Sequence, residues 1–199
     1  MLFRSRRLGA YEVSKVLAYL AMQAQQQAAG QVPISWIHPA TVIADPACPE
    51  VPEQSAMAGI LRLLSAGRMP WVPGSAAHRV PWVTGDYVAR YTVALLEGAQ
   101  AEGDHVLLDP ASPNLLETTR SLAPWLRARA PFGHVPLPWF RALLAVPGVA
   151  RLMGTSAESL SFIVDTLPDV SASLAWGERH GVRHPDIQQA LACTAQAWA

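Results

Sequence analysis

One lysine, Lys15, stands in this chain of 199 residues, and Tyr11 lies four residues before it. Because the other 14 of the 15 basic residues are arginines, this position indicates a need for a compact ammonium that a planar guanidinium does not replace. On a helix, a spacing of four residues places both side chains on one face. The ammonium then favours tyrosinate and lowers the phenol pKa from about 10 toward neutral pH. Tyr11 is therefore a candidate general acid and base.

The same spacing also arises by chance, and the pair is then a surface phenol beside a solvated ammonium. The elements around the pair bear on this choice. Apolar residues recur at helical spacing over residues 9–29, and Gly30 closes this predicted helix. A β-rich run over residues 32–37 follows and predicts a buried strand, ended by His38 and Pro39.

The rest of the chain divides by the same signals. Helices are predicted over residues 53–66, 85–97, 112–128, 137–146, 156–164, 170–179 and 185–198, and extended pieces over residues 69–72, 79–83 and 105–108. Ser112 and Pro113 predict the start of the 112–128 helix, in which Pro124 predicts a kink. The order predicts an α/β layer followed by a small helical cap. Only two good core strands are found, whereas a parallel sheet usually has about five or six, so we expect the latter part of a domain.

Composition argues against several classes of protein. The 15 acidic and 15 basic residues cancel, with no long run of either sign, so nucleic acid is not an expected partner. No apolar stretch reaches the roughly 20 residues that span a bilayer, and the start lacks a signal-peptide core. Cys48 and Cys193 lack metal-type spacing and fit a reduced, cytoplasmic compartment. Gly181 interrupts any helix that would present His180 and His184 together, so no metal is expected.

Three segments and their order carry more information. Residues 11–15 read YEVSK, residues 38–42 read HPATV, and residues 80–89 read VPWVTGDYVA, before a predicted strand and helix. They resemble the extended short-chain dehydrogenase/reductase family, which includes the NAD-dependent epimerase/dehydratases. That family has Tyr-x-x-Ser-Lys on its active-site helix, Arg-Pro-x-x-Val-x-Gly after the next strand, and a Val-Pro-hydrophobic-x-Asp-Val-Ala segment. Several segments in order are more specific than the Tyr-x-x-x-Lys spacing alone.

The resemblance implies an NAD- or NADP-dependent oxidoreductase acting on a small molecule. Tyr11 would exchange a proton with the substrate carbonyl or hydroxyl while a hydride moves to or from nicotinamide. Lys15 would bind the nicotinamide ribose and lower the Tyr11 pKa. Among the tryptophans, Trp71 and Trp82 would line the substrate side and favour an apolar carbonyl, alcohol or acyl substrate. They could equally be core aromatic residues.

The cofactor side is assigned by the same resemblance. His38, Pro39, Ala40 and Thr41 would lie beside the nicotinamide, outside the carboxyl end of a strand, where α/β folds bind ligands. His38 replaces the family's usual Arg, so a histidine that only caps the strand is an equally open interpretation. The family's Gly-x-x-Gly-x-x-Gly motif is absent from these 199 residues, so we expect a missing amino-terminal half to be required.

The expected architecture is the carboxyl-terminal part of a Rossmann-type doubly wound α/β sheet with a mostly helical substrate-side subdomain. The first would comprise residues 1–45 and 84–128, and the second residues 46–83 and 129–199. Two rival interpretations remain, a non-catalytic NAD(P)-scaffold binding or regulatory module and a small helical interaction protein. The retained Tyr11 and Lys15 count against the first rival, and the ordered segments count against the second.

Overall fold

The computed structural model describes residues 10–29, 34–47, 49–53, 55–98, 102–150, 160 and 162–199, with side chains of the first helix described over 13–26. In chain order the elements are α2 (Ala10–Ala29), β1 (Ser35–Pro39), β2 (Thr41–Ile43), α3 (Ala56–Ser65), β3 (Trp71–Pro73), β4 (Trp82–Thr84), α4 (Gly85–Glu97), β5 (Gly103–Leu107), α5 (Leu115–Leu122), β6 (Gly133–Val135), α6 (Leu137–Leu144), α8 (Ser171–Arg179) and α9 (Ile187–Trp198).

All the strand pairs found in the described residues are parallel. β1 pairs with β5, with Ser35 opposite Gly103 and Pro39 opposite Leu107. β2 pairs with β4, and β3 pairs with β6. The chain passes from the first pair to the second within two residues, because Ala40 N donates to Leu107 O at 2.9 Å and Thr41 N donates to Pro81 O at 3.0 Å. The carboxyl end of β1 is thereby joined directly to the β2–β4 pair.

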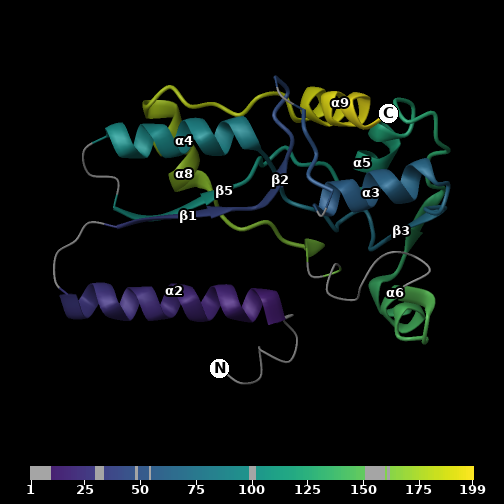
Figure 1. Ribbon diagram of the computed structural model, residues 1–199, viewed down its shortest axis with the longest axis horizontal. Helices are drawn as coiled ribbons and strands as arrows, with labels where there is room; N and C mark the ends of the chain where they lie inside the picture. Colours follow the sequence, from purple (N-terminus) through teal and green to yellow (C-terminus); the bar gives the residue numbers. More distant parts are fainter. Residues whose placement is uncertain are drawn as a thin grey trace.

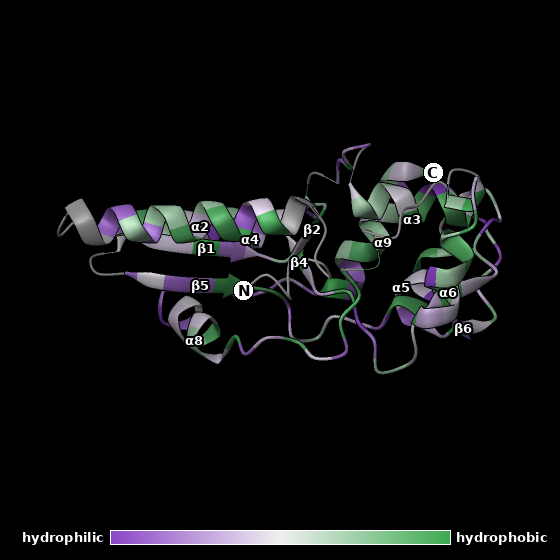
Figure 2. Ribbon diagram, turned by 90° about the horizontal axis from the view of Figure 1, so that it is seen from below, coloured by the Kyte–Doolittle hydropathy of each residue, from purple (hydrophilic) through white to green (hydrophobic). Residues whose placement is uncertain are grey.

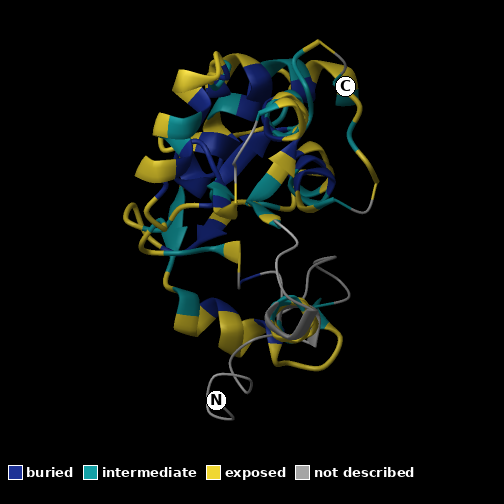
Figure 3. Ribbon diagram, turned by 90° about the vertical axis from the view of Figure 1, so that its left-hand side faces the viewer, coloured by how far each residue is buried: buried dark blue, intermediate teal, exposed yellow. Residues whose placement is uncertain are grey.

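Helices cover both faces of the β1–β5 pair. α2 lies along one face, and α4 lies on the opposite face (Figure 1). α8 packs against β5, although its sequence belongs to the segment expected in the substrate-side subdomain. Val83, Tyr87, Tyr91 and Leu107 are buried between α4 and the strands. Figure 3 shows the buried residues gathered away from α2, none of whose described side chains is buried.

A second group of elements, α3, α5, α6 and α9, lies beyond the ends of β1 and β5 (Figure 2). α9 packs against α5, and Ser121 Oγ donates to Gln188 Oε1 across this contact at 2.8 Å. Leu61, Trp82 and Leu191 are fully buried in the core that α3, α5 and α9 share with β3 and β4, and α6 packs in a smaller cluster of its own. The two groups of elements meet through the β2–β4 pair.

Most element boundaries follow the sequence prediction, and α4 matches it residue for residue. The start of α5 was predicted wrongly. Asn114, not Ser112, caps this helix: its side chain accepts from Glu117 N at 2.9 Å, and Glu117 Oε2 accepts from Asn114 N at 3.0 Å. This reciprocal capping box satisfies two backbone donors. Ser112 instead accepts a hydrogen bond from Trp82 N at 2.9 Å.

Two further differences have simple physical causes. α5 ends at Leu122 and does not continue through a kink, because Pro124 has no N–H with which to extend it. β2 and β6 were not predicted, since each is a three-residue strand set by its pairing with a distant strand and, unlike β3 and β4, neither lies in a predicted extended run. The helix predicted over residues 156–164 lies largely outside the described residues.

Leu191→Ala should lower the free energy of unfolding by about 2–5 kcal/mol, because Leu191 is fully buried between α9 and its neighbours. Leu96, which is 83% exposed on α4, provides the matched control. Leu96→Ala should change the same free energy by no more than about 0.5 kcal/mol. Urea unfolding followed by circular dichroism measures both values, and equal effects would contradict the assigned core.

Candidate functional site

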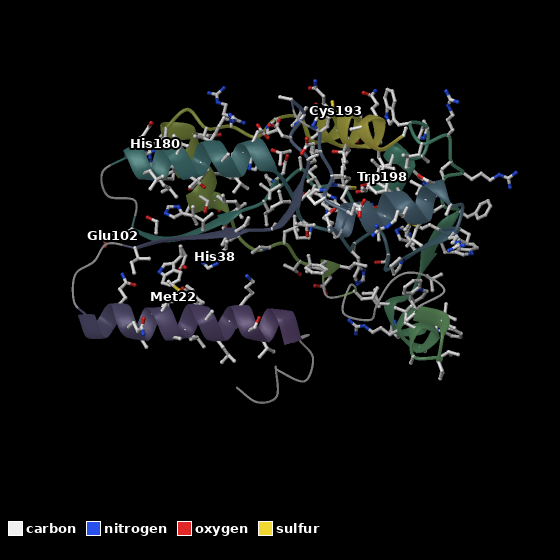
Figure 4. The ribbon with its side chains drawn as sticks, viewed as in Figure 1. Met22, His38, Glu102, His180, Cys193 and Trp198 are labelled. Atoms are coloured by element: carbon white, nitrogen blue, oxygen red, sulfur yellow. The ribbon has the colours of Figure 1, made fainter. Side chains whose placement is uncertain are left out.

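α2 is docked on the β1–β5 pair by an aromatic and polar cluster centred on Tyr19. The Tyr19 hydroxyl lies 2.9 and 3.1 Å from the two carboxylate oxygens of Asp104, which stands near the start of β5. Its ring packs edge-on against Trp36 and His38 of β1, with centroids 4.8 and 5.3 Å apart. In Figure 4, His38 projects from β1 toward α2, and Met22 projects from α2 toward the strand. The cluster therefore fixes which face of α2 points at the sheet.

His38, a predicted cofactor residue, belongs to this cluster. Its Nε2 lies 2.8 Å from Asp104 Oδ1. The hydrogen bond from His38, with a further one from Tyr19, holds the pKa of Asp104 below its ordinary value of 3.8. The bond to Asp104 in turn raises the pKa of Tyr19 above 10.0. In this structure His38 ties two strands and a helix together.

The candidate proton-transfer pair lies on the same helix as Tyr19. Lys15 is exposed in α2, one turn before Tyr19. Tyr11 lies one turn before Lys15, and its side chain is outside the described residues. α2 runs opposite to β1, so the end of α2 that carries both positions lies at the carboxyl end of β1 (Figure 1). That end is the edge at which parallel α/β sheets bind ligands.

Pro39, Ala40 and Thr41 stand at this same edge. Pro39 is the last residue of β1, and Thr41 is the first residue of β2. The N–H groups of Ala40 and Thr41 are already donated to Leu107 and Pro81. A ligand at this junction could still bind the other backbone atoms of residues 39–41 and the Thr41 hydroxyl.

An apolar cavity of about 380 Å³ lies among α3, β3, β4 and α6. Its volume falls at the lower end of the range for small-molecule sites, roughly 300–1,000 Å³. Trp71 and Trp82 both line it: Trp82 is fully buried, and Trp71 is 49% exposed. Phe140 also lines it, whereas Trp139 is 76% exposed and does not.

The pairing of β2 with β4 connects the β1–β2 junction to the cavity wall. Thr41 is the register partner of Trp82, and Trp82 is part of the cavity wall. The α3 side of this wall, which includes Gly59, Ile60 and Leu63, was not predicted from the sequence. A signal was present, since a glycine in the interior of an amphipathic helix lowers helix propensity and needs a reason.

A second polar cluster stands at the start of α4 and has a structural explanation. Arg90 bonds Asp86 at 2.8 Å and the Arg183 carbonyl at 3.0 Å, which ties α4 to the segment before α9. His184 stacks on Tyr87 with ring centroids 3.5 Å apart, and burial lowers the pKa of His184. Burial also raises the pKa of Tyr87 to about 12. Asp86 thus has a structural role, and its place in the first turn of α4 is favourable for a negative charge.

Neither a metal centre nor a membrane-spanning helix is found in the part of the chain that the structure describes. No group of three or more His, Cys, Asp or Glu side chains is arranged to hold a metal ion. None of the described helices combines the length and the apolar character needed to cross a bilayer.

No family model and no curated protein matches this chain in sequence. Solved structures do match in fold. The human epimerase family protein SDR39U1 (isoform 2), crystallised with NADPH, is 16% identical with a TM-score of 0.50 and covers 89% of this chain. The protein gox2253 is 18% identical with a TM-score of 0.65 over 98% of this chain. The terminal R domain of the myxalamid PKS-NRPS pathway is 17% identical, with a TM-score of 0.57 over 83%.

This chain spans 54%, 57% and 43% of the lengths of those three proteins, or about half. The similarity confirms the predicted fold class, a Rossmann-type α/β fold with parallel strands.

Asp104→Asn should make the free energy of unfolding depend less on pH in the acidic range. Because the folded-state pKa of Asp104 is lowered, its contribution is present above its ordinary value of 3.8 and is lost as the pH falls through the folded-state value. Urea midpoints measured from pH 6 to pH 2.5 should therefore fall less steeply below pH 3.8 in the variant than in the wild type. Glu50→Gln, an exposed carboxylate outside this cluster, is the control and should keep the wild-type slope.

Gly59→Ala should stabilise the protein by roughly 0.5–1 kcal/mol, because alanine reduces the conformational freedom that a helical glycine loses on folding. Apart from Gly59 itself, its two chain neighbours and the adjoining helix backbone, no heavy atom lies within 4 Å of the position that the new Cβ would take, so the methyl group enters the cavity without a clash. The midpoint of urea unfolding measures the change. Gly67→Ala is the contrast: Gly67 has φ +66, and alanine there should destabilise.

Proposed function

We propose that this chain supplies the catalytic and substrate-binding half of an NAD(P)-dependent oxidoreductase of the extended short-chain type. In this proposal Tyr11 is the general acid and base, and Lys15 holds the nicotinamide ribose and lowers the Tyr11 pKa. The substrate is a small molecule with an apolar carbonyl, alcohol or acyl group. The observation that carries the proposal is the placement of the start of α2 at the carboxyl end of β1.

Helix geometry supports this placement. The Tyr19 cluster anchors the middle of α2 beside His38, the second-to-last residue of β1. Tyr11 precedes Tyr19 by eight residues, which corresponds to about 12 Å at 1.5 Å per residue. Because α2 runs opposite to β1, this length extends past the end of the strand to the level of the β1–β2 junction (Figure 1). Lys15 lies between the two tyrosines at helical spacing of four residues.

The groups at this edge match the nicotinamide end of a dinucleotide. They are an ammonium, a hydroxyl on Thr41 and backbone atoms of Pro39 and Ala40, which suit ribose hydroxyls and a carboxamide. The human protein of similar fold was crystallised with NADPH, which supports a cofactor of this class. When bound, the cofactor supplies or accepts the hydride. A glycine-rich unit for the pyrophosphate is not among these 199 residues, so the proposal includes one from elsewhere.

The proposed work of this chain is proton transfer and exclusion of water. Tyr11 would donate a proton to the substrate oxygen as hydride arrives at its carbon, and would accept it in the reverse direction. The ammonium of Lys15 would stabilise the tyrosinate that remains. The apolar cavity, whose wall includes Trp82, the register partner of Thr41, would hold the body of the substrate in a site with little water.

Tyr11→Phe should lower the rate of hydride transfer by about 10²–10⁴-fold, the usual contribution of a general acid, while cofactor affinity stays close to wild type. The protein is expressed from its locus together with any in-frame coding sequence ahead of Met1. Titration with NADH and NADPH and turnover with aldehydes and ketones are then measured. Gln25→Ala, an exposed change on the same helix outside the Tyr19 cluster, is the control and should retain turnover.

Cofactor binding without turnover in the wild type would favour a binding or regulatory module instead. Equal rates for Tyr11→Phe and the wild type would remove Tyr11 from the mechanism.

A further inference from the structure

The charged residues that line the cavity, within the described part of the chain, are all positive. Arg62 and Arg68 both line it, and within the described part of the chain no Asp or Glu does. Both arginines are exposed and Trp71 is half exposed, whereas most of the other residues that line the cavity are apolar. The cavity therefore has a mostly apolar lining with two positively charged residues.

Neither arginine is used by the fold. Among the described residues, no side chain forms a hydrogen bond or an ion pair with the guanidinium of Arg62 or Arg68. In contrast, Arg79 donates to the Ser112 carbonyl at 2.8 Å, and Arg120 donates to the Phe132 carbonyl at 3.2 Å. Arginine forms paired hydrogen bonds with carboxylates and phosphates in a fixed planar geometry. Two such groups that line one apolar cavity and have no partner in the described structure are suited to bind an anion.

The backbone holds both arginines in place on one wall. Arg62 lies in the last turn of α3, three residues after the cavity residue Gly59 and hence on a neighbouring part of the helix surface. Gly67, with φ +66, then turns the chain back. This turn is closed by hydrogen bonds from Gly67 N to Leu64 O at 3.0 Å and from Arg68 N to Leu63 O at 2.9 Å. Arg68 is thereby fixed against the end of the helix that carries Arg62.

We propose that this cavity binds a molecule with an apolar body and an anionic end, and that Arg62 and Arg68 bind that end. The anionic group is a carboxylate or a phosphate, and the apolar body lies against α3, Trp71 and Trp82. This inference rests on the proposed function in taking the cavity as the substrate site. It narrows the substrate from any apolar carbonyl or alcohol compound to an amphipathic anion.

Three eight-carbon probes separate the two parts of the proposal: octanoate, octyl phosphate and octan-1-ol. Isothermal titration calorimetry with the 199-residue chain should show at least one anion binding about tenfold more tightly than the alcohol. The double variant Arg62→Ala/Arg68→Ala should remove this advantage and leave octan-1-ol binding unchanged. Whichever anion binds more tightly identifies the carboxylate or the phosphate as the preferred group.

Two further variants control for bulk charge and for location. Arg141 on α6 is exposed and lies outside the cavity lining, so Arg141→Ala should change all three affinities by less than about twofold. Gly59→Phe should abolish binding of all three probes, because the ring would occupy the open space above Gly59. Circular dichroism establishes that each variant is folded, and Gly59→Leu replaces Gly59→Phe if the larger side chain prevents folding.

The proposal is wrong if octan-1-ol binds the wild type as tightly as both anions, or if the double arginine variant keeps the anion preference. If Arg141→Ala lowers the anion affinity as much as the double arginine variant does, the preference comes from the overall charge of the protein and the proposal is wrong. If the Gly59 variant binds the anions as tightly as the wild type, the anions bind outside the cavity and the proposal is also wrong. These measurements need no cofactor. A failure of hydride transfer with intact anion binding would overturn the proposed function alone, and turnover without anion preference would overturn this inference alone.

Discussion

The arrangement of the candidate site depends on one stretch of backbone, residues 39–43, where the chain leaves one parallel pair of strands and joins another. Ala40 donates to β5, and Thr41 donates to the residue before β4. Since each residue in a strand has its partners set by register, this change of partner fixes the distance between the end of β1 and the cavity wall. Everything proposed about substrate and cofactor relies on that fixed distance.

α2 is held in a different way from the rest of the molecule. The strands, α4, α5 and α9 are joined by buried apolar side chains, whereas the described side chains of α2 are exposed or half-buried. Its contact with the sheet is an aromatic cluster with hydrogen bonds among Tyr19, His38 and Asp104. Contacts of this kind specify orientation more than they add stability, because exposed charged pairs contribute little. The cluster sets which helical face meets the sheet.

The sequence predicted elements well where local chemistry and tertiary packing agree. α4 begins at Gly85 and Asp86, ends at Glu97 and buries one continuous stripe, so periodicity and the acidic first turn indicated the same helix. α5 shows the opposite case. Ser112-Pro113 is a good local start signal, but Ser112 is used to bind Trp82 across 30 residues, and Asn114 takes the capping role. A sequence pattern cannot show which of two possible capping residues will instead form a hydrogen bond with a distant strand.

By itself, the sequence determined the α/β class, the helix that carries Tyr11 and Lys15, and the order of segments that resembles the extended reductases. These are local properties, set by spacing and residue type along the chain. The tertiary structure alone decided that His38 binds Asp104 across two strands and that Trp82 lines a cavity while Trp139 faces solvent. It also decided that Arg62 and Arg68 line that cavity and have no side-chain partner within the described parts of the chain. Such facts depend on which distant residues meet, and that is settled only when strand register and helix packing are complete.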